Sequence, residues 1–217
     1  MTTGAGTVTR VDVWFDFLCP WCLLGKRRFE AALARSGRRD AVAVHWRSFE
    51  LMPDLPKEPG PTIPERMRRD LGVTAAEAAR GIERLSAMAA ETGLAYRLDI
   101  ARPVNSFDAH RLMHAGQAGG AGDAVREQLG RAYTEHGAIL SDHAVLARLG
   151  RRAGLPDALV REVLAGSAYA EDVRADERAA ARLGVTGVPT FVFDESQTVS
   201  GAQPVEVFVS LLTGSAR

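Results

Sequence analysis

Cys19 and Cys22 are the only cysteines among the 217 residues of the chain, and two residues separate them. Dithiol–disulfide exchange needs one thiolate that attacks and a second thiol that resolves the mixed disulfide. One turn of helix brings two thiols with this spacing together. Pro20 suits the first position of a helix, so Cys19 is expected at a helix start, where free backbone N–H groups stabilise a thiolate. We therefore assign Cys19 as the nucleophile and Cys22 as the resolving thiol.

Two other interpretations of the cysteine pair stay open. A structural zinc site normally takes four ligands, so histidines or a second chain would have to complete it. The pair can also be two inert, buried cysteines. We favour redox chemistry over both and expect no bound metal. In motifs of this kind the first thiol has a pKa of roughly 3.5–7.5, and the two intervening residues, Pro20 and Trp21, tune it.

The elements around the pair form a strand, a helix and a second strand. Apolar residues alternate along 11–16, which predicts a strand that leads into the cysteines. The helix is expected to run from Pro20 to about Arg35, and renewed alternation predicts a strand from Val42 to about Glu50. Two strands joined in this way predict a parallel pair with a right-handed crossover.

The middle of the chain is helical. Five of the ten prolines lie between Pro53 and Pro64, which predicts a stiff, extended linker. Thr74 and Glu77 then have the spacing of a capping box, with Gly93 expected near the end of that helix. Further helices are expected over residues 106–115, 123–136, 141–153, 156–164 and 168–183.

Strand signals return only near the end of the chain. Thr190–Phe193 is β-branched and aromatic, a short strand is expected over 198–200, and Pro204 opens a last helix. The simplest account is an α/β fold with an inserted helical domain. Its first part is predicted over 8–52, the helical insertion over 53–183, and its second part over 184–217.

Pro189 directly precedes the predicted strand at Thr190. A proline can simply begin a strand, because that position needs no N–H donor. The functional alternative is a cis peptide bond between Val188 and Pro189. Such a turn would place the Val188 backbone against the active site and offer its N–H and C=O to an extended peptide.

The segments Asp16 to Cys22 and Gly184 to Phe191 resemble motifs of the DsbA-like thioredoxin-fold oxidoreductases, and the FrnE-type branch most closely. Residues 105–112 and 200–204 add to this resemblance, which spans about residues 10–212. It implies a thioredoxin fold with a large helical insertion, cis-Pro189 facing Cys19, and Asn105 and His110 lining the substrate groove. It also implies a thiol–disulfide oxidoreductase, with disulfide isomerisation as a variant, that acts on protein or peptide thiols and disulfides.

Two other functions are kept as alternatives. The same superfamily holds 2-hydroxychromene-2-carboxylate isomerases and kappa-class glutathione transferases, which typically place serine where this chain has Cys19. The presence of both cysteines counts against that function, although a low-molecular-weight thiol is compatible as a co-substrate. The third possibility is a peptide-binding or chaperone-like module without turnover. We expect no cofactor beyond the redox-active Cys19–Cys22 disulfide.

Asp16 and a pair of histidines each allow more than one role. Asp16, three residues before Cys19, can relay the proton of Cys22 as a general base, or it can cap the helix or bind the backbone. His110 and His114 are four residues apart, a spacing that can bind metal, but no further ligand lies near them in the sequence.

Composition limits the partners. The 27 basic and 27 acidic residues cancel, which argues against nucleic acid or an anionic membrane as the main partner. No apolar run approaches the ~20 residues of a membrane span. Because Met1–Gly6 shows no pattern of a secretory signal, we expect a cytoplasmic protein. The direction of exchange and the oligomeric state do not follow from the sequence.

Overall fold

The structure, a computed structural model, describes residues 9–214. Residue 8 and residues 215–217, the outer ends of the predicted parts, lie outside the described residues, as does the Met1–Gly6 segment. Between residues 9 and 214, no helix is both long enough and apolar enough to cross a membrane.

A four-stranded mixed sheet forms the centre of the fold. Its strands are β1 (Thr9–Phe15), β2 (Val42–Ser48), β3 (Thr190–Phe193) and β4 (Gln197–Ser200), in the spatial order β2-β1-β3-β4. β1 and β2 are parallel, with Thr9 opposite Val42, so the predicted parallel pair is confirmed. β3 is antiparallel to both β1 and β4.

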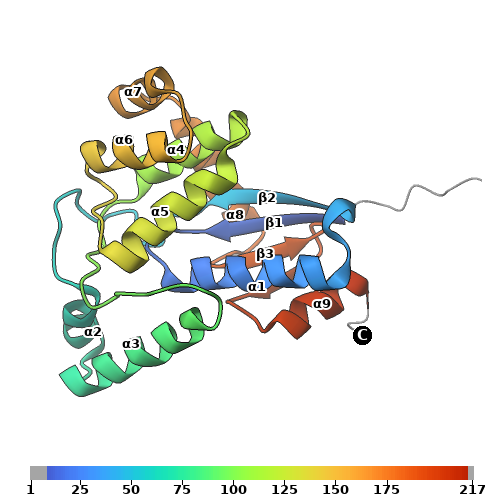
Figure 1. Cartoon of the computed structure of the whole chain (residues 1–217), viewed down its shortest axis with the longest axis horizontal. Helices are drawn as coiled ribbons and strands as arrows, with labels where there is room; N and C mark the ends of the chain where they lie inside the picture. The colour runs from blue at the N-terminus through green and yellow to red at the C-terminus, as the bar shows by residue number, and fades with distance from the viewer. Residues whose placement is uncertain (1–8, 215–217) are drawn as a thin grey trace, which may run out of the picture.

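Helices cover both faces of this sheet. On one face lie α1 (Pro20–Ser36) and α9 (Val205–Thr213), and on the other lies α8 (Ala170–Arg182) (Figure 1). Phe29 of α1, Phe191 of β3 and Phe208 of α9 pack with ring centroids 4.6–5.4 Å apart. On the α8 face, Trp14 is buried and its indole N–H donates to the Asp176 carbonyl at 3.0 Å. The packing of the three phenylalanine rings holds α1 and α9 on the first face, and the Trp14 hydrogen bond holds α8 on the second.

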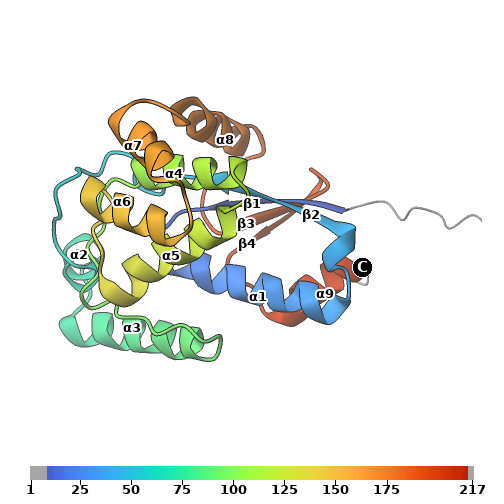
Figure 2. The same ribbon diagram turned by 45° about the horizontal axis from the view of Figure 1, so that its top comes forward.

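Seven helices lie between β2 and β3 in the chain. They are α2 (Ile63–Leu71), α3 (Ala75–Ala90), α4 (Phe107–Ala118), α5 (Gly122–His136), α6 (His143–Arg152), α7 (Asp157–Ala165) and α8. Figure 2 shows α2 to α7 gathered at the end of the sheet where α1 begins. The predicted fold class, a thioredoxin fold with a large helical insertion, is therefore confirmed.

The sequence prediction did not identify α2 as a helix separate from the linker before it. The extended linker predicted over Pro53 to Pro64 overlaps the start of α2, which begins at Ile63. Thr62 and Glu65 form a complete capping box at its start, as Thr74 and Glu77 do for α3. Pro64 is tolerated because the first turn of a helix has no partner for its N–H groups.

β2 forms one edge of the sheet and ends at Ser48, two residues earlier than predicted. The Ser48 N–H donates to the Asp176 carboxylate at 2.9 Å instead of to another strand. The same carboxylate pairs with Arg47 at 3.0 Å and with His114 at 3.1 Å. A polar cleft of about 510 Å³ runs beside this edge, between Trp46 and Arg126 on one side and α8 on the other.

Candidate active site

Cys19 is the N-cap residue of α1. Its backbone is extended (φ −88°, ψ 108°), Pro20 takes the first helical position, and the Cys22 N–H donates to the Cys19 carbonyl at 2.9 Å. Both cysteines are free thiols, and 6% of Cys19 and 2% of Cys22 is exposed. The pair therefore lies in its reduced form at the uncapped start of a helix, where the backbone favours negative charge.

The loop before β3 lies against Cys19. The peptide bond between Val188 and Pro189 is cis, and the Cys19 thiol donates to the Val188 carbonyl at 3.4 Å. α1 approaches this loop closely, because a Cβ atom on Gly25 would come within 2.9 Å of the Pro189 ring. Glycine at position 25 thus lets the helix and the loop meet beside the thiol.

Cys22 lies deeper, beneath Cys19. Its sulfur accepts the Asp16 N–H at 3.4 Å and borders an enclosed cavity of about 10 Å³, which is too small for more than one water molecule. Burial raises the pKa of Cys22 well above its usual value, and the neighbouring Cys19 sulfur and Asp16 carboxylate add to the rise. Cys22 is therefore the more deeply buried of the two cysteines, in an environment that disfavours its thiolate form.

The Asp16 carboxylate is completely buried next to the pair. It accepts the Leu18 N–H at 3.2 Å, the Leu51 N–H at 2.7 Å and the His110 Nε2 proton at 3.3 Å. In the described part of the chain no lysine or arginine pairs with it. The carboxylate thus holds together the turn before α1, the segment after β2, and α4.

His110 and Asn105, both expected to line the groove, take different positions. His110 is completely buried beneath the site, with its ring centroid 5.7 Å from that of Phe15 and 5.1 Å from that of Phe17, and its Nδ1 has no partner. Asn105 donates its side-chain amide to the Pro53 carbonyl at 3.0 Å and to Glu50 at 3.3 Å. It therefore shapes the segment after β2, whereas His110 supports Asp16 from below.

Trp21 lies within the motif, and Tyr96 contacts the motif from the segment after α3. Trp21, between the two cysteines, is 41% exposed, and Leu51, whose N–H binds Asp16, is 40% exposed. Tyr96 donates its hydroxyl to the Pro20 carbonyl at 2.6 Å. Burial raises the pKa of Tyr96, and negative charge on Cys22 and Cys19 adds to the rise. No local pattern indicates this contact, because 76 residues separate its partners.

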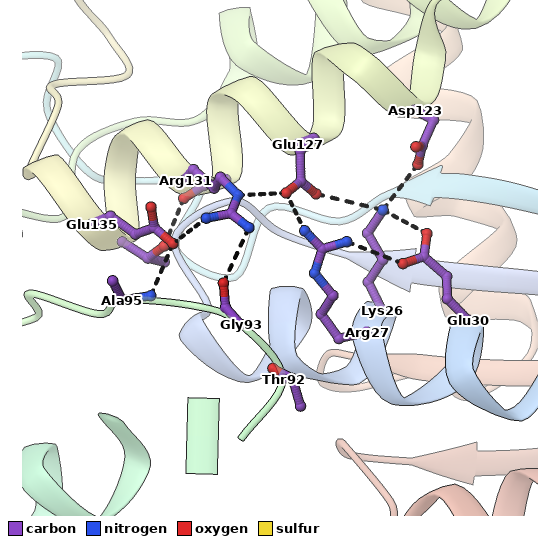
Figure 3. A network of polar contacts seen from close by, with 12 residues as sticks. Lys26, Arg27, Glu30, Thr92, Gly93, Ala95, Asp123, Glu127, Arg131 and Glu135 are labelled. Atoms are coloured by element: carbon purple, nitrogen blue, oxygen red, sulfur yellow. Dashed lines mark hydrogen bonds and ion pairs between the residues drawn. The ribbon is translucent and has the colours of Figure 1, made fainter. Parts of the chain in front are cut away.

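A network of ion pairs joins α1 to α5 (Figure 3). The Lys26 side chain, only 3% exposed, pairs with Glu30 at 2.6 Å, Asp123 at 3.0 Å and Glu127 at 3.6 Å. Glu127 also pairs with Arg27 and with Arg131, the latter at 2.5 Å. Charges at i,i+4 spacing along both helices were the available sequence signal, but it does not reveal which helices pair.

The same network reaches the segment between α3 and α4. Arg131 pairs with Glu135 at 2.8 Å and donates to the Gly93 carbonyl at 3.2 Å, and Glu135 accepts the Ala95 N–H at 3.0 Å (Figure 3). α5 is therefore tied both to the helix that carries the cysteines and to the segment that carries Tyr96.

His114, four residues after His110 on α4, contacts the edge of the sheet rather than Asp16. Its Nε2 contacts the Ser48 hydroxyl at 3.0 Å and Asp176 at 3.1 Å, at the edge of the sheet. Residues 9–214 contain no group of three or more His, Cys, Asp or Glu side chains placed to hold a metal ion.

Comparison with known proteins agrees with this geometry. A description of the DsbA-like thioredoxin domain matches residues 10–213. The crystal structure of a probable DsbA oxidoreductase, SCO1869 from Streptomyces coelicolor, has 43% sequence identity and a TM-score of 0.92, covering 96% of this chain and 91% of that one. An uncharacterized protein of Bacillus subtilis, YwbO, is 24% identical over 200 residues, which is 91% of this chain and 92% of YwbO.

A more distant structure shares the fold. The cytosolic disulfide reductase DsbM from Pseudomonas aeruginosa, solved with GSH, has a TM-score of 0.64 at 20% identity, covering 95% of this chain and 98% of that one. At this identity the likeness concerns the fold alone. The domain match over almost the whole described chain, together with the cysteine pair at the start of α1, places the protein in the DsbA-like thioredoxin-domain family of oxidoreductases.

Proposed function

We propose that the chain is a thiol–disulfide oxidoreductase that exchanges disulfides through Cys19 and Cys22 of its Cys-Pro-Trp-Cys motif. One observation carries the proposal: the Cys19 sulfur lies at the start of α1, 3.4 Å from the Val188 carbonyl, with Cys22 one turn below. A thiol so placed can attack a disulfide while a neighbouring backbone holds the substrate.

The exchange proceeds in two displacements. In the reducing direction, the Cys19 thiolate attacks a substrate disulfide, a bond forms between Cys19 and one substrate sulfur, and the other leaves as a thiolate that takes up a proton. Cys22 then loses its proton and attacks the Cys19 sulfur, releasing the second substrate thiolate and leaving the Cys19–Cys22 disulfide. The oxidising direction reverses these steps, and isomerisation combines both on one substrate.

Asp16 is the group that we assign to take the proton of Cys22. Cys22 is buried with a raised pKa, so its attack on the mixed disulfide requires a base. The Asp16 carboxylate is buried beside it, and the Asp16 N–H already contacts the Cys22 sulfur. The carboxylate also accepts two backbone N–H groups, so it serves structure and chemistry together.

We expect protein or peptide substrates bound in extended form beside Val188 and Pro189. The exposed apolar surfaces of Trp21 and Leu51 suit such segments. A small thiol is expected as the reductant or oxidant that resets the pair, and the cytoplasm as the compartment. The name of DsbM, a cytosolic disulfide reductase of the same fold, supports this setting.

Turnover of a peptide disulfide with a small-thiol reductant tests the proposal. Replacing Cys19 with Ser should abolish turnover, whereas Cys22→Ser should stop the reaction at a mixed disulfide between Cys19 and the substrate, visible by mass spectrometry. Undiminished turnover by the Cys19→Ser variant would overturn the proposal. Absence of turnover by the unaltered protein, with every peptide and small thiol tried, would also overturn it.

A further inference from the structure

The buried Asp16 carboxylate has three hydrogen-bond donors. Its Oδ1 accepts the Leu18 N–H at 3.2 Å and the His110 Nε2 proton at 3.3 Å, and its Oδ2 accepts the Leu51 N–H at 2.7 Å. A carboxylate has about four acceptor positions, so one position is left on Oδ2. Asp16 and Cys22 line the same small cavity, and the remaining position can take the Cys22 proton.

His110 is the donor that comes from a side chain. Leu18 and Leu51 donate from the backbone, where a change of side chain leaves the N–H in place. Among residues 9–214, no lysine or arginine forms an ion pair with Asp16. A buried carboxylate without a paired cation depends on hydrogen bonds for the stability of its charged form. His110 therefore supplies part of that stability.

The surroundings of His110 fix which ring nitrogen carries the proton. The side chain is completely buried on α4, and its ring packs against Phe15 and Phe17. Its Nδ1 has no hydrogen-bond partner in the described part of the chain, whereas its Nε2 faces Asp16. A proton on Nδ1 alone would turn the Nε2 lone pair toward the carboxylate charge. Nε2 is therefore the protonated nitrogen whenever Asp16 is ionised.

We propose that His110 is a positioning residue for the resolving step: its Nε2–H donates to Asp16 and sets the pH above which Asp16 is ionised and can take the Cys22 proton. The inference rests on the proposed function, in which Cys22 attacks the mixed disulfide. In that step the Cys22 proton passes to Asp16, a bond forms between the Cys22 and Cys19 sulfurs, and the substrate thiolate leaves. His110 keeps its own proton throughout.

The two-step reaction of the reduced protein with dithiodipyridine tests this role. Cys19 attacks the reagent and releases one thiopyridone; Cys22 then attacks the mixed disulfide on Cys19 and releases the second. Excess reagent makes the first step the faster one, so the absorbance of thiopyridone rises in two phases. The rate of the second phase reports the resolving step and is measured as a function of pH.

His110→Phe removes the donor and keeps an aromatic ring between Phe15 and Phe17. Without the donor, the Asp16 carboxylate holds its proton to a higher pH. A hydrogen bond to a charged group typically changes such an equilibrium by about tenfold, so the pH at half the maximal second-phase rate should rise by about one unit. His110→Gln can still donate from its amide and should keep the midpoint of the parent.

His114→Phe is the matched control, because it removes an imidazole from the same helix that contacts Asp176 at the sheet edge, and its midpoint should equal that of the parent. The other titratable or charged groups around Asp16 and His110 are unaltered in these variants. They are Cys19, Cys22 and Lys26 on α1, Glu50 after β2, Arg126 and Tyr133 on α5, and Arg174 of α8, which pairs with Glu50.

An unchanged midpoint in His110→Phe would overturn the proposal, and so would equal rises in the Phe and Gln variants, which would assign His110 to packing alone. If His110→Phe does not fold, His110→Met is the second variant without a donor, since methionine fills irregular apolar space.

NMR of the unaltered protein with ¹⁵N-labelled histidine adds a measurement that needs no stable variant. The His110 signal, identified by its loss in His110→Gln, should show a proton on Nε2 at neutral pH, and a proton on Nδ1 alone would overturn the proposal. Absence of a second phase in the unaltered protein at every pH would overturn the proposed function, and this inference with it. A second phase whose midpoint does not respond to His110 would overturn this inference alone.

Discussion

Asp108 of α4 should stabilise the helical part of the fold by an amount that depends on pH. Its carboxylate pairs with Lys57 at 2.7 Å, Arg111 at 2.8 Å and His143 at 2.8 Å. Burial alone would raise the pKa of Asp108, but the hydrogen bonds from Lys57, His143 and Arg111 outweigh it and lower the value from 3.8 to about 2. A pKa that is lower in the folded state means that folding is favoured when the group is ionised.

The size of the effect follows from this shift. A difference between 3.8 and about 2 corresponds to about 2 kcal/mol of folding free energy at pH 7. The contribution is complete above pH 4 and is lost as pH falls through about 2; roughly half remains at pH 3. Asp108→Asn should therefore lower the free energy of unfolding by about 2 kcal/mol at pH 7, and by about half as much at pH 3.

Urea unfolding of the parent and the variant at both pH values measures this difference. Asp70→Asn is the matched control, because Asp70 pairs with Arg69 and Arg66 on the surface, where removing the charge should leave the unfolding midpoint unchanged. An Asp108→Asn variant as stable as the parent at pH 7 would refute the reasoning. A deficit of equal size at pH 7 and pH 3 would show that lost packing, rather than lost charge, is responsible.

Two further predictions concern the cysteine helix. In a Cys19→Ser variant, Cys22 is the only thiol. Because burial raises the pKa of Cys22, iodoacetamide should modify it at pH 7 at least about tenfold more slowly than free cysteine. A rate equal to that of free cysteine would contradict its buried environment. Lys26→Met removes the buried cation that three carboxylates share. The free energy of unfolding in urea should fall by about 1–2 kcal/mol. The loss is limited because those carboxylates are partly exposed and Glu127 keeps its pairs with Arg27 and Arg131. Asp123→Asn, at the exposed end of the same network, should cost less than about 0.5 kcal/mol, and equal losses in the two variants would argue against a special role for Lys26.

The parts of the fold that could be predicted are those that short-range patterns determine. Alternating residues located β1, β-branched and aromatic residues located β3, and the Thr74 capping box located the start of α3, because these signals lie within a few residues of the element they define. β2 ends earlier than predicted because its partner β1 ends at Phe15, and the Asp176 carboxylate that takes the outward N–H of Ser48 lies 128 residues away in the chain. No local pattern reports such a partner.

The same limit applies to the candidate site. The cysteines and Pro189 could be named because a spacing and a motif carry them. Tyr96 was missed, since a tyrosine between predicted helices looks the same in the sequence whether its hydroxyl meets solvent or a backbone carbonyl. His110 was expected in the groove, but its burial between two phenylalanine rings depends on how α4 packs on β1. Only the packed structure shows which buried polar atoms have partners.

The Asp176 carboxylate at the end of β2 also bears on aggregation. Exposed strand edges present unpaired N–H and C=O groups on which a second chain can add a strand. Here Asp176 occupies the outward N–H of Ser48, and Arg47 is bound to the same carboxylate. At the opposite edge, the Gln203 side chain donates to the Ser200 carbonyl at the end of β4. A strand that adds to either edge of the sheet would first have to displace these polar side chains, which disfavours aggregation by strand addition. The cysteine pair lies at the start of α1, away from both edges.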